Sequence, residues 1–437
     1  MWLALLFACT PRSFDVGMGP GASDPGDGTT IPPDDDTWVV TGTDTADTDT
    51  DTDTDTDTDT DTGPPIPDKE EQAAYEAFYG LGSVHEVRLY VTDEAIAAMN
   101  ADVREALSGR DLVMEWQHGD VEIDGQRFDD IAVRVKGSST LQNFNGKPSL
   151  KLKLNEWVGG QTFAGLERIT LNNDVEDPSQ IRQVMVYHTN FRAGRLASRA
   201  SHAQVYVNDE LYGLYTNLET MDDRWLWRRY VDGSGDLWEG NDYADFSRST
   251  AGYWELASGE GDGDRDAIVA AGAELRDTGA DWYSRMDALV DMDDFVHFWA
   301  WRIAVGDLDG YPANANDVYI YRNPEDGRFD FFPWGTDESY DDYAPEYWSY
   351  ASCLLGIACV GNTECLAAYR VALGEVADAS EALALVDDFD LVDAATSEAL
   401  AADPKRAYSE QDARFYRSET RADILSFPER IRQYAGL

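Results

Sequence analysis

The sequence predicts an α+β fold in which a region rich in antiparallel strands precedes a mainly helical region. Between residues 85 and 218, short segments alternate apolar and polar side chains and are separated by Gly, Asn and Asp, which is typical of strands joined by tight turns. Beyond Met221 the chain is rich in Ala and favours helices, apart from one strand hairpin at residues 318–332. With 437 residues, 43% of them hydrophobic, the chain can bury one large core or two modest ones.

The net charge of the chain excludes some classes of partner. With 34 Lys plus Arg against 84 Asp plus Glu, the formal charge is −50. A nucleic-acid backbone would be repelled, and so would the surface of an anionic membrane. The five His residues are scattered without a pair at metal-binding spacing, and no Gly-X-Ser-X-Gly motif is present. Nothing therefore points to a Ser-His-Asp hydrolase.

The sequence of the N-terminal part predicts export from the cytoplasm and a disordered tether. Residues 1–9 form a short apolar run that looks like the end of a bacterial lipoprotein signal, with Cys9 as the lipidated residue. We therefore expect an exported protein of the cell envelope or the extracellular space, whose expected contact with a membrane is a lipid anchor on Cys9. Residues 10–67 include an uninterrupted Asp-Thr alternation from Asp47 to Thr62 and are predicted to form a disordered tether.

The remaining cysteines lie close together near the end of the chain. Cys353, Cys359 and Cys365 fall within thirteen residues. A zinc site is disfavoured because no His lies nearby to complete four ligands. We expect one local disulfide that leaves one thiol, and the spacing does not decide which pair forms it.

The folded part is expected at residues 68–437, with a strand-rich first lobe at about 68–220 and a helical second lobe at about 221–437. In the first lobe, Asp177-Pro178-Ser179 caps a helix, and the turn at Asn208-Asp209-Glu210 joins two strands. In chain order the predicted elements are a helix (69–79), a strand (85–91), a capped helix (from Thr92-Asp93 through 95–99), strands (120–124, 130–136 and 147–154), a helix (180–193), a strand hairpin (204–218) and a helix opening at 222–226.

Two features of the first lobe favour anion binding. Residues 136–140, Lys-Gly-Ser-Ser-Thr, form a small-residue loop whose backbone N–H groups could approach phosphate oxygens, although such loops are also ordinary turns. Residues 147–154 alternate strictly, so that Lys151 and Lys153 share one face of a strand. A basic stripe is unusual in so acidic a chain, and a solvated strand face is the alternative explanation.

The chain is organised around residues 307–337 of the second lobe. An acidic, Asn-rich loop leads into the first strand of the hairpin, and the second strand ends at Pro333-Trp334-Gly335-Thr336-Asp337. Two clusters of carboxylate and amide oxygens are thereby delivered to the ends of one antiparallel hairpin. Oxygen ligands on rigid strands suit a hard cation such as Mg²⁺ with bound phosphates. The same residue types also crowd ordinary turns for backbone reasons alone.

Four segments together resemble the spore coat protein H (CotH) kinase-like family. They are residues 134–140 with 147–153, residues 171–174 with 179–182, residues 205–215 with Glu219, and residues 309–337. The resemblance covers most of residues 80–345 in the expected order. It implies an atypical protein-kinase-like, two-lobed fold that binds ATP with Mg²⁺ or Mn²⁺ and phosphorylates Ser or Thr of a protein, here expected to be an envelope or secreted protein.

The resemblance also implies roles for particular residues. Asp309 would be the catalytic-loop acid that accepts or orients the substrate hydroxyl. Asp337 would hold the metal ion, with Asn314, Asn316 and Asp317 as candidates for the assisting ligand. The cofactor-binding candidates are Lys151 or Lys153 at the phosphates, the loop from Lys136 through Ser138 and Ser139 over them, and Glu219 near the adenine. The family's closing motif is often Pro-Trp-Asp-X-Asp, and Gly335 stands where its first Asp would be.

A non-catalytic surface module of the same fold, used for adhesion or attachment, is the main alternative, favoured by the acidic surface, the tether and Gly335. A calcium-dependent binding protein is a weaker one.

Overall fold

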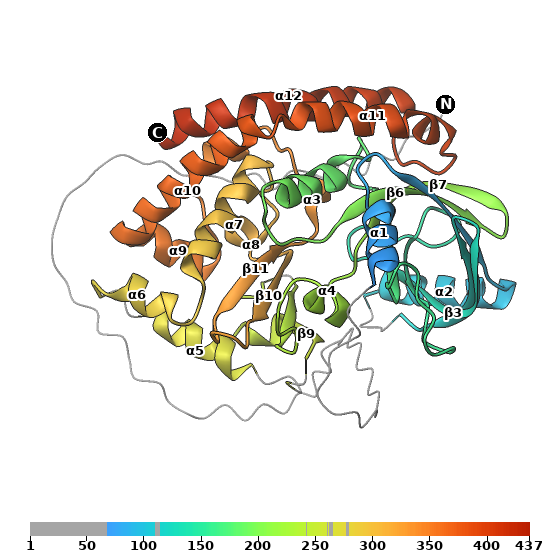
Figure 1. The fold of residues 1–437 in the computed structure, drawn as a ribbon, viewed down its shortest axis with the longest axis horizontal. Helices are drawn as coiled ribbons and strands as arrows, with labels where there is room; N and C mark the ends of the chain where they lie inside the picture. The colour runs from blue at the N-terminus through green and yellow to red at the C-terminus, as the bar shows by residue number, and fades with distance from the viewer. Residues whose placement is uncertain (1–67, 110–113, 242, 260, 262–264, 277–278) are drawn as a thin grey trace. The chain divides into compact units, whose positions relative to one another are not determined.

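The computed structural model describes residues 68–437 except 110–113, 242, 260, 262–264 and 277–278. The expected signal, the lipidated Cys9 and the tether lie outside the described residues. Within the described part, a strand-rich region precedes a mainly helical one, so the predicted α+β class is confirmed. Figure 1 shows these elements with the labels used below.

The strands of the first region form a closed barrel in the order β1-β2-β3-β4-β5-β7-β6. Neighbours pair antiparallel, except that β1 and β6 pair in parallel and close the barrel. The sequence predicted a meander and a hairpin but no closure, because the β1–β6 pair joins segments more than a hundred residues apart. The strands are β1 (Val84–Tyr90), β2 (Gln117–Ile123), β3 (Gln126–Lys136), β4 (Ser149–Lys153), β5 (Arg168–Asn172), β6 (Ala200–Val207) and β7 (Glu210–Leu218).

Local sequence explains where several strands and helices of this region begin and end. Asn208 and Asp209 both adopt positive φ, which matches the tight turn of the β6–β7 hairpin. Asp177 accepts hydrogen bonds from the backbone N–H groups of Ser179, Ile181 and Arg182, and so satisfies donors in the turn before the third helix, whose N-cap position is Ile181. The helices of this region are α1 (Lys69–Phe78), α2 (Asp93–Ala106) and α3 (Arg182–Arg192).

The predicted hairpin of the second region is part of a four-stranded antiparallel sheet in the order β11-β10-β8-β9. The strands β8 and β9 were not predicted. Each is short, and β8 reads Leu-Trp-Glu-Gly without a clean alternation, so neither stands out from its surroundings. The strands are β8 (Leu237–Gly240), β9 (Trp254–Ser258), β10 (Val318–Arg322) and β11 (Phe329–Pro333).

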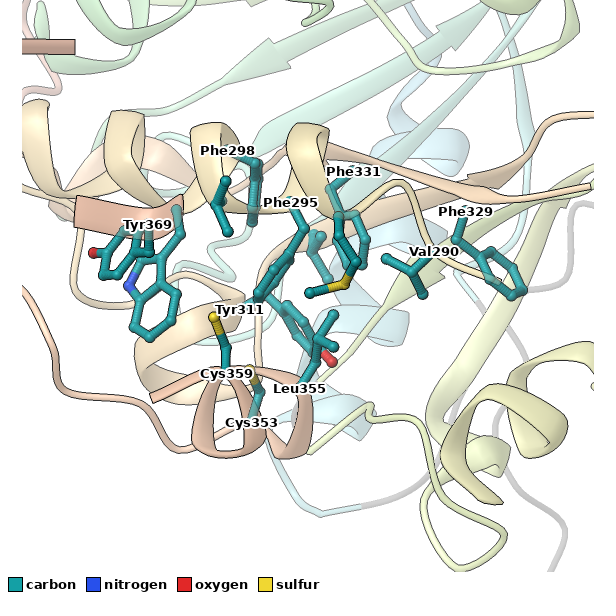
Figure 2. Packing of buried hydrophobic residues seen from close by; sticks show 14 of the residues in the cluster. Val290, Phe295, Phe298, Tyr311, Phe329, Phe331, Cys353, Leu355, Cys359 and Tyr369 are labelled. Atoms are coloured by element: carbon teal, nitrogen blue, oxygen red, sulfur yellow. The ribbon is translucent and has the colours of Figure 1, made fainter. Parts of the chain in front are cut away.

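Helix α7 packs its aromatic side chains onto this sheet and onto α10. Phe295 and Phe298 lie against Phe331 of β11, and Trp299 stacks on Tyr369 of α10 with ring centroids 4.2 Å apart (Figure 2). The helices of this region are α4 (Asp223–Trp227), α5 (Asp266–Glu274), α6 (Trp282–Asp287), α7 (Met292–Ala304), α8 (Tyr311–Asn314), α9 (Leu354–Gly361), α10 (Thr363–Ala382), α11 (Leu385–Ala402) and α12 (Glu410–Ala435), with 3₁₀ turns η1 (Ala251–Tyr253), η2 (Thr336–Glu338) and η3 (Ala344–Tyr347).

None of the helices that the structure describes combines the length and the apolar character needed to cross a bilayer.

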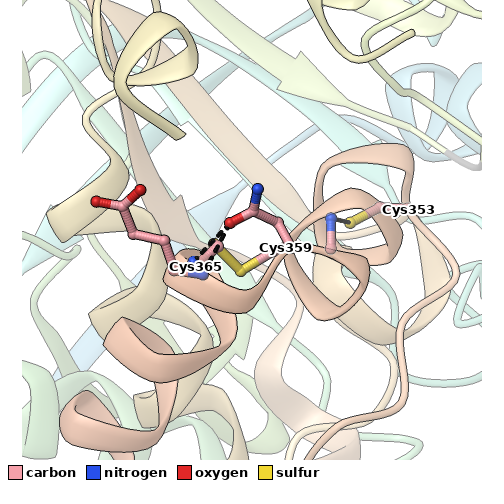
Figure 3. The surroundings of a disulfide bond; sticks show 6 residues. Cys353, Cys359 and Cys365 are labelled. Carbon is pink, nitrogen blue, oxygen red and sulfur yellow. Dashed lines mark hydrogen bonds between the residues drawn. A yellow bond between two sulfur atoms is a disulfide. The ribbon is translucent and has the colours of Figure 1, made fainter. Parts of the chain in front are cut away.

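The three clustered cysteines form one disulfide and leave one thiol, as expected. Cys359 and Cys365 are bonded across the junction of α9 and α10, and Cys353 is a buried thiol at the start of α9 (Figure 3). The backbone N–H of Gly356 donates to the Cys353 sulfur, which therefore caps α9.

A buried ion pair connects the C-terminal helices to the barrel. Asp403, in the connector between α11 and α12, accepts from Lys147 Nζ at 2.9 Å and from the backbone N–H of Leu214 at 3.1 Å. The two charged side chains are 0% and 3% exposed. A Cβ at Gly213 would lie 2.2 Å from the Asp403 carboxylate, so the connector fits only because residue 213 is Gly.

We expect Asp403→Asn to lower the free energy of unfolding by about 3–5 kcal/mol, because it leaves the buried Lys147 ammonium without a counter-charge. Denaturant unfolding of the full chain, followed by circular dichroism, measures this change. Glu410→Ala is the matched control, because the exposed Glu410–Arg414 pair of α12 contributes on the order of 0.5 kcal/mol. Equal effects of the two substitutions would contradict the importance given to the buried pair.

Candidate functional site

A cavity of about 680 Å³ is lined by the barrel on one side and by the four-stranded sheet with the loops at its end on the other. Cavities of this size hold cofactors and drug-sized ligands. The barrel side supplies the two lysines with hydroxyls, amides and the carboxylate of Glu176, and the other side supplies the remaining carboxylates together with amides. The lining includes Lys136, Gly137, Ser138, Ser139, Thr140, Ser149, Lys151, Asn172, Asn173 and Glu176 from the first region, and Glu239, Asn241, Glu255, Asp309, Asn314, Asn316, Asp317, Trp334, Gly335, Asp337 and Glu338 from the second.

Two lysines on neighbouring barrel strands supply positive charge to the cavity. Strands β3 and β4 pair so that Lys136 lies opposite Ser149, two residues before Lys151. Lys136 Nζ donates to Asn172 Oδ1 at 2.8 Å and lies 5.6 Å from the centre of the Trp334 ring. Burial, and secondarily the charge of Lys151, lowers the pKa of Lys136 from 10.5 to about 8. Both lysines would therefore gain from an anion in the cavity.

Asp309 is held by two amides of its own loop. Asn314 Nδ2 donates to Asp309 Oδ1 at 2.6 Å, and Asn316 Nδ2 donates to Oδ2 at 3.3 Å. Helix α8 and the left-handed Ala315 between these asparagines bring both amides back towards Asp309. The carboxylate is thereby oriented at the wall of the cavity.

Asp317 and Asp337 lie at the two strand ends of the hairpin. Burial, and then the charge of Glu176, raises the pKa of Asp337 from 3.8 to about 7. Burial, and then the charges of Asp309 and Asp337, raises the pKa of Asp317 well above its usual range. These shifts indicate carboxylates that lack sufficient positive charge around them, which is the condition that a bound cation relieves.

The Asp317 carboxylate rests directly on Gly335. A Cβ at residue 335 would lie 2.1 Å from Asp317 Oδ2. Residue 335 itself has a left-handed φ of 51°, and Asp317 has a φ of 49°. A side chain at residue 335 would therefore have to displace the Asp317 carboxylate, and the left-handed φ independently favours Gly at this position.

Two of the predicted site residues do not line the cavity. Lys153 Nζ pairs with Glu156 at 2.8 Å, one alternation further along β4 than Lys151. Glu219 is buried at the end of β7 in a separate network, where it accepts from Tyr75 Oη at 2.7 Å and pairs with Arg229 at 2.5 Å. The Glu219 network joins α1 to the end of the barrel. The other predicted residues all line the cavity: Lys136, Ser138, Ser139, Lys151, Asp309, Asn314, Asn316, Asp317 and Asp337.

The sequence did not single out Glu176, Asn172 or Glu239 as site residues. Ser139 Oγ donates to Glu176 Oε2 at 3.3 Å, which joins the small-residue loop to the acidic part of the cavity. Glu176 lies just before the capped start of α3, in a stretch whose motif signal is the helix cap and not a ligand. Glu239 lies on the unpredicted strand β8, so only the fold could place it here.

Within the described ranges, no three His, Cys, Asp or Glu side chains form a ready-made metal site. The acidic residues of the cavity nevertheless offer oxygen donors, the type that Mg²⁺ and Mn²⁺ prefer. Lys136 and Lys151 fit the phosphates of a nucleotide, and the carboxylates of Asp317 and Asp337 fit the metal ion that accompanies it.

Comparison with known proteins gives relatives for the chain. Inner spore coat protein H of Bacillus subtilis (strain 168) is 27% identical over 193 residues, which are 41% of this chain and 52% of that protein. Invasin CotH3 of Rhizopus delemar is 23% identical over 231 residues, and Invasin CotH2 of the same organism is 23% identical over 229 residues. Each match covers 49% of this chain and 37% of the invasin. The chain thus spans about half the length or less of these relatives.

A solved structure of the Shewanella oneidensis MR-1 toxin–antitoxin complex of HipA, HipB and operator DNA aligns with 10% identity and a TM-score of 0.33, covering 69% of this chain and 68% of that one. A TM-score this low supports no conclusion about the present fold. The family model described as CotH kinase protein matches residues 133–361, just over half of the 437 residues. That range contains the cavity lysines, the Asp309 loop and Asp337, and the chain belongs to the CotH kinase protein family.

Proposed function

We propose that this protein is an atypical protein kinase that transfers the γ-phosphoryl group of ATP to a Ser or Thr hydroxyl of an envelope or secreted protein. One observation carries the proposal: Lys136 and Lys151 line the same cavity as Asp309 and Asp337, from opposite sides. Phosphoryl transfer needs little beyond positioning and charge neutralisation, so cations for the phosphates, oxygens for a metal ion and one carboxylate for the acceptor can suffice.

The barrel side would hold the triphosphate. In a chain of net charge −50, an anion needs local cations, and Lys136 and Lys151 provide them. The loop of residues 137–140 adds hydroxyl and backbone donors, and Glu176 fixes that loop through Ser139. Binding of a phosphate would favour the charged form of Lys136, which burial disfavours in the free protein.

The other side would hold the metal ion and orient the acceptor. Asp337 and Asp317 are the proposed carboxylate ligands. The amide nitrogens of Asn314 and Asn316 are used to hold Asp309, so only their carbonyl oxygens are available to a metal ion. When bound, Mg²⁺ or Mn²⁺ would neutralise charge on the phosphates. Asp309, fixed by both amides, would accept a hydrogen bond from the substrate hydroxyl and take its proton.

The names of the relatives support a location at the cell surface. Two are called invasins and one a spore coat protein. Together with the lipoprotein-like start at Cys9, these names support a protein of the cell envelope or the extracellular space, with a protein of the same compartment as its substrate.

A non-catalytic surface module of the same fold is the second candidate. One sequence feature favours it: residue 335, where the family motif often has Asp, is Gly. In such a module the cavity would bind no nucleotide, and surface attachment would be the activity.

We expect Asp337→Ala to abolish Mg²⁺-dependent binding of ATP, and Asp309→Ala to spare binding while lowering transfer by roughly 10²–10⁴-fold. Binding is measured as the rise in unfolding midpoint of the full chain, because a ligand at 100 times its Kd stabilises the native state by about 2.7 kcal/mol. Transfer is measured with labelled ATP and casein as a Ser-rich acceptor.

Glu325→Ala, an exposed acid at the turn of the same hairpin, is the control for these two substitutions and should change neither readout. Unaltered binding in Asp337→Ala would overturn the assigned roles. A wild-type midpoint that does not respond to ATP with Mg²⁺ or Mn²⁺ would favour the non-catalytic module.

We also expect affinity for ATP to fall as pH rises through about 8, because Lys136 then loses the proton that attracts phosphate. Lys136→Arg keeps the charge and should flatten this dependence, as measured by calorimetry between pH 7 and 9. Among nearby charges, that of Lys151 lowers the pKa of Lys136, and those of Glu239, Asp337 and Asp317 raise it. A wild-type profile identical to that of Lys136→Arg would contradict the prediction.

The same pKa has an opposite effect on stability in the absence of nucleotide. The pKa of Lys136 is lower in the folded protein than its ordinary value of 10.5, so between about 8 and 10.5 the unfolded chain binds more protons. The contribution of Lys136 to the free energy of unfolding therefore rises with pH across that window. Lys136→Arg should remove this rise.

A further inference from the structure

Arg302, in the last turn of α7, makes a buried ion pair beneath the loop that carries Asp309. Its Nη2 atom lies 2.8 Å from Asp307 Oδ2, and the two side chains are 3% and 1% exposed. The preceding turn of α7 is fixed in the aromatic core through Phe298 and Trp299. Arg302 therefore extends from a rigid element towards the loop.

The same guanidinium also contacts the segment that leads to Asp337. Arg302 Nη1 donates to the backbone carbonyl of Trp334 at 3.3 Å. Trp334 directly follows β11 and precedes the turn of Gly335–Asp337. One side chain thus contacts both stretches of chain that carry the proposed functional carboxylates.

Asp307 completes the connection to the loop. Its Oδ1 atom accepts from the backbone N–H of Gly310 at 3.1 Å, and its own N–H donates to the Arg302 carbonyl at 2.8 Å. Asp309 lies between the two residues that this carboxylate joins. Asp307 therefore holds the backbone on both sides of Asp309, through its own N–H on one side and through its carboxylate on the other.

The fit of the guanidinium against the loop leaves no room for a side chain at residue 310. A Cβ there would lie 1.5 Å from Arg302 Nη2. The φ of Gly310 is −73°, which any residue adopts, so the requirement for Gly comes from contact with Arg302 and not from the backbone. Gly310 therefore provides a second, independent way to disturb the pair.

A buried ion pair is weak evidence of a gain in stability, because removing both charges from water costs several kcal/mol that their attraction only partly offsets. A pair at this position is better explained by what it holds in place. The planar fork of Arg can contact a carboxylate and a carbonyl together, which the single ammonium of Lys does less well.

We propose that Arg302 is a positioning residue that holds the Asp309 loop and the Asp337 segment in a fixed relation to each other on one side of the cavity. The consequence for ATP rests on the proposed function, whereas the coupling of the two segments does not. Misplacement of reacting groups by about 1 Å can cost on the order of 100-fold in rate. A residue that fixes both segments would therefore control transfer through the Asp309 loop and nucleotide binding through the Asp337 segment, without touching substrate.

The test compares Arg302→Lys with wild type in the full chain. Hydrogen exchange of backbone amides is followed in peptides covering residues 305–317 and 333–341, and the Kd for ATP with Mg²⁺ is measured by calorimetry. We expect exchange to accelerate at least tenfold in both peptides together, and the Kd to rise at least tenfold. Peptides from α2 should exchange as in wild type.

Arg432→Lys is the control, because Arg432 of α12 is an arginine that pairs with two acids, Glu381 and Asp378, neither of which lines the cavity. It should leave both peptides and the Kd unchanged. Gly310→Ala should reproduce the effect of Arg302→Lys on both peptides, since its Cβ displaces the guanidinium without removing it.

Faster exchange in one peptide alone, or in neither, would overturn the proposal, as would a lower unfolding midpoint with an unchanged Kd. If wild type binds no ATP, the proposed kinase function fails, and the exchange result still decides whether Arg302 couples the two segments.

Discussion

The placement of Lys136 between two differently built parts of the molecule is the constraint on which the site depends. Its ammonium is attached to the barrel, yet it lies against the Trp334 ring of the second region. Burial lowers its pKa to about 8, so its charge at neutral pH depends on the acidic side chains across the cavity. The barrel and the sheet must therefore keep their separation for the lysines and the carboxylates to act on the same ligand.

Much of the site was visible in the sequence because it is encoded in short-range patterns. The strict alternation at residues 147–154 placed Lys151 on a strand face, and the hairpin at 318–332 placed Asp309, Asp317 and Asp337 near one end of a sheet. Period-two alternation and turn residues act over a few positions, so they survive without knowledge of the fold. The sequence also predicted one disulfide and one thiol among the three clustered cysteines, because their spacing is short, but it did not predict which pair forms.

What the sequence did not show depends on contacts between distant segments. Lys153 has the same local pattern as Lys151, but the edge of the cavity falls between them and leaves Lys153 with Glu156. Glu219 follows a strand, as a site residue would. It is nevertheless buried in a separate network with Tyr75, which is distant in sequence, and Arg229, which is close in sequence. Closure of the barrel by β1 and β6, and the short strands β8 and β9, likewise have no local signature.

The contact between Asp317 and Gly335 bears on how motifs in such proteins are compared. One volume beside the cavity can be filled by a side chain that flanks either strand of the β10–β11 hairpin, and here residue 317 fills it. A homologue with this backbone and a side chain at residue 335 needs a smaller side chain at residue 317, or one that points elsewhere. We therefore expect the two positions to change together. The absence of an acidic residue at position 335 therefore does not by itself indicate that the site has lost its chemistry. The residue at position 317 has to be compared at the same time.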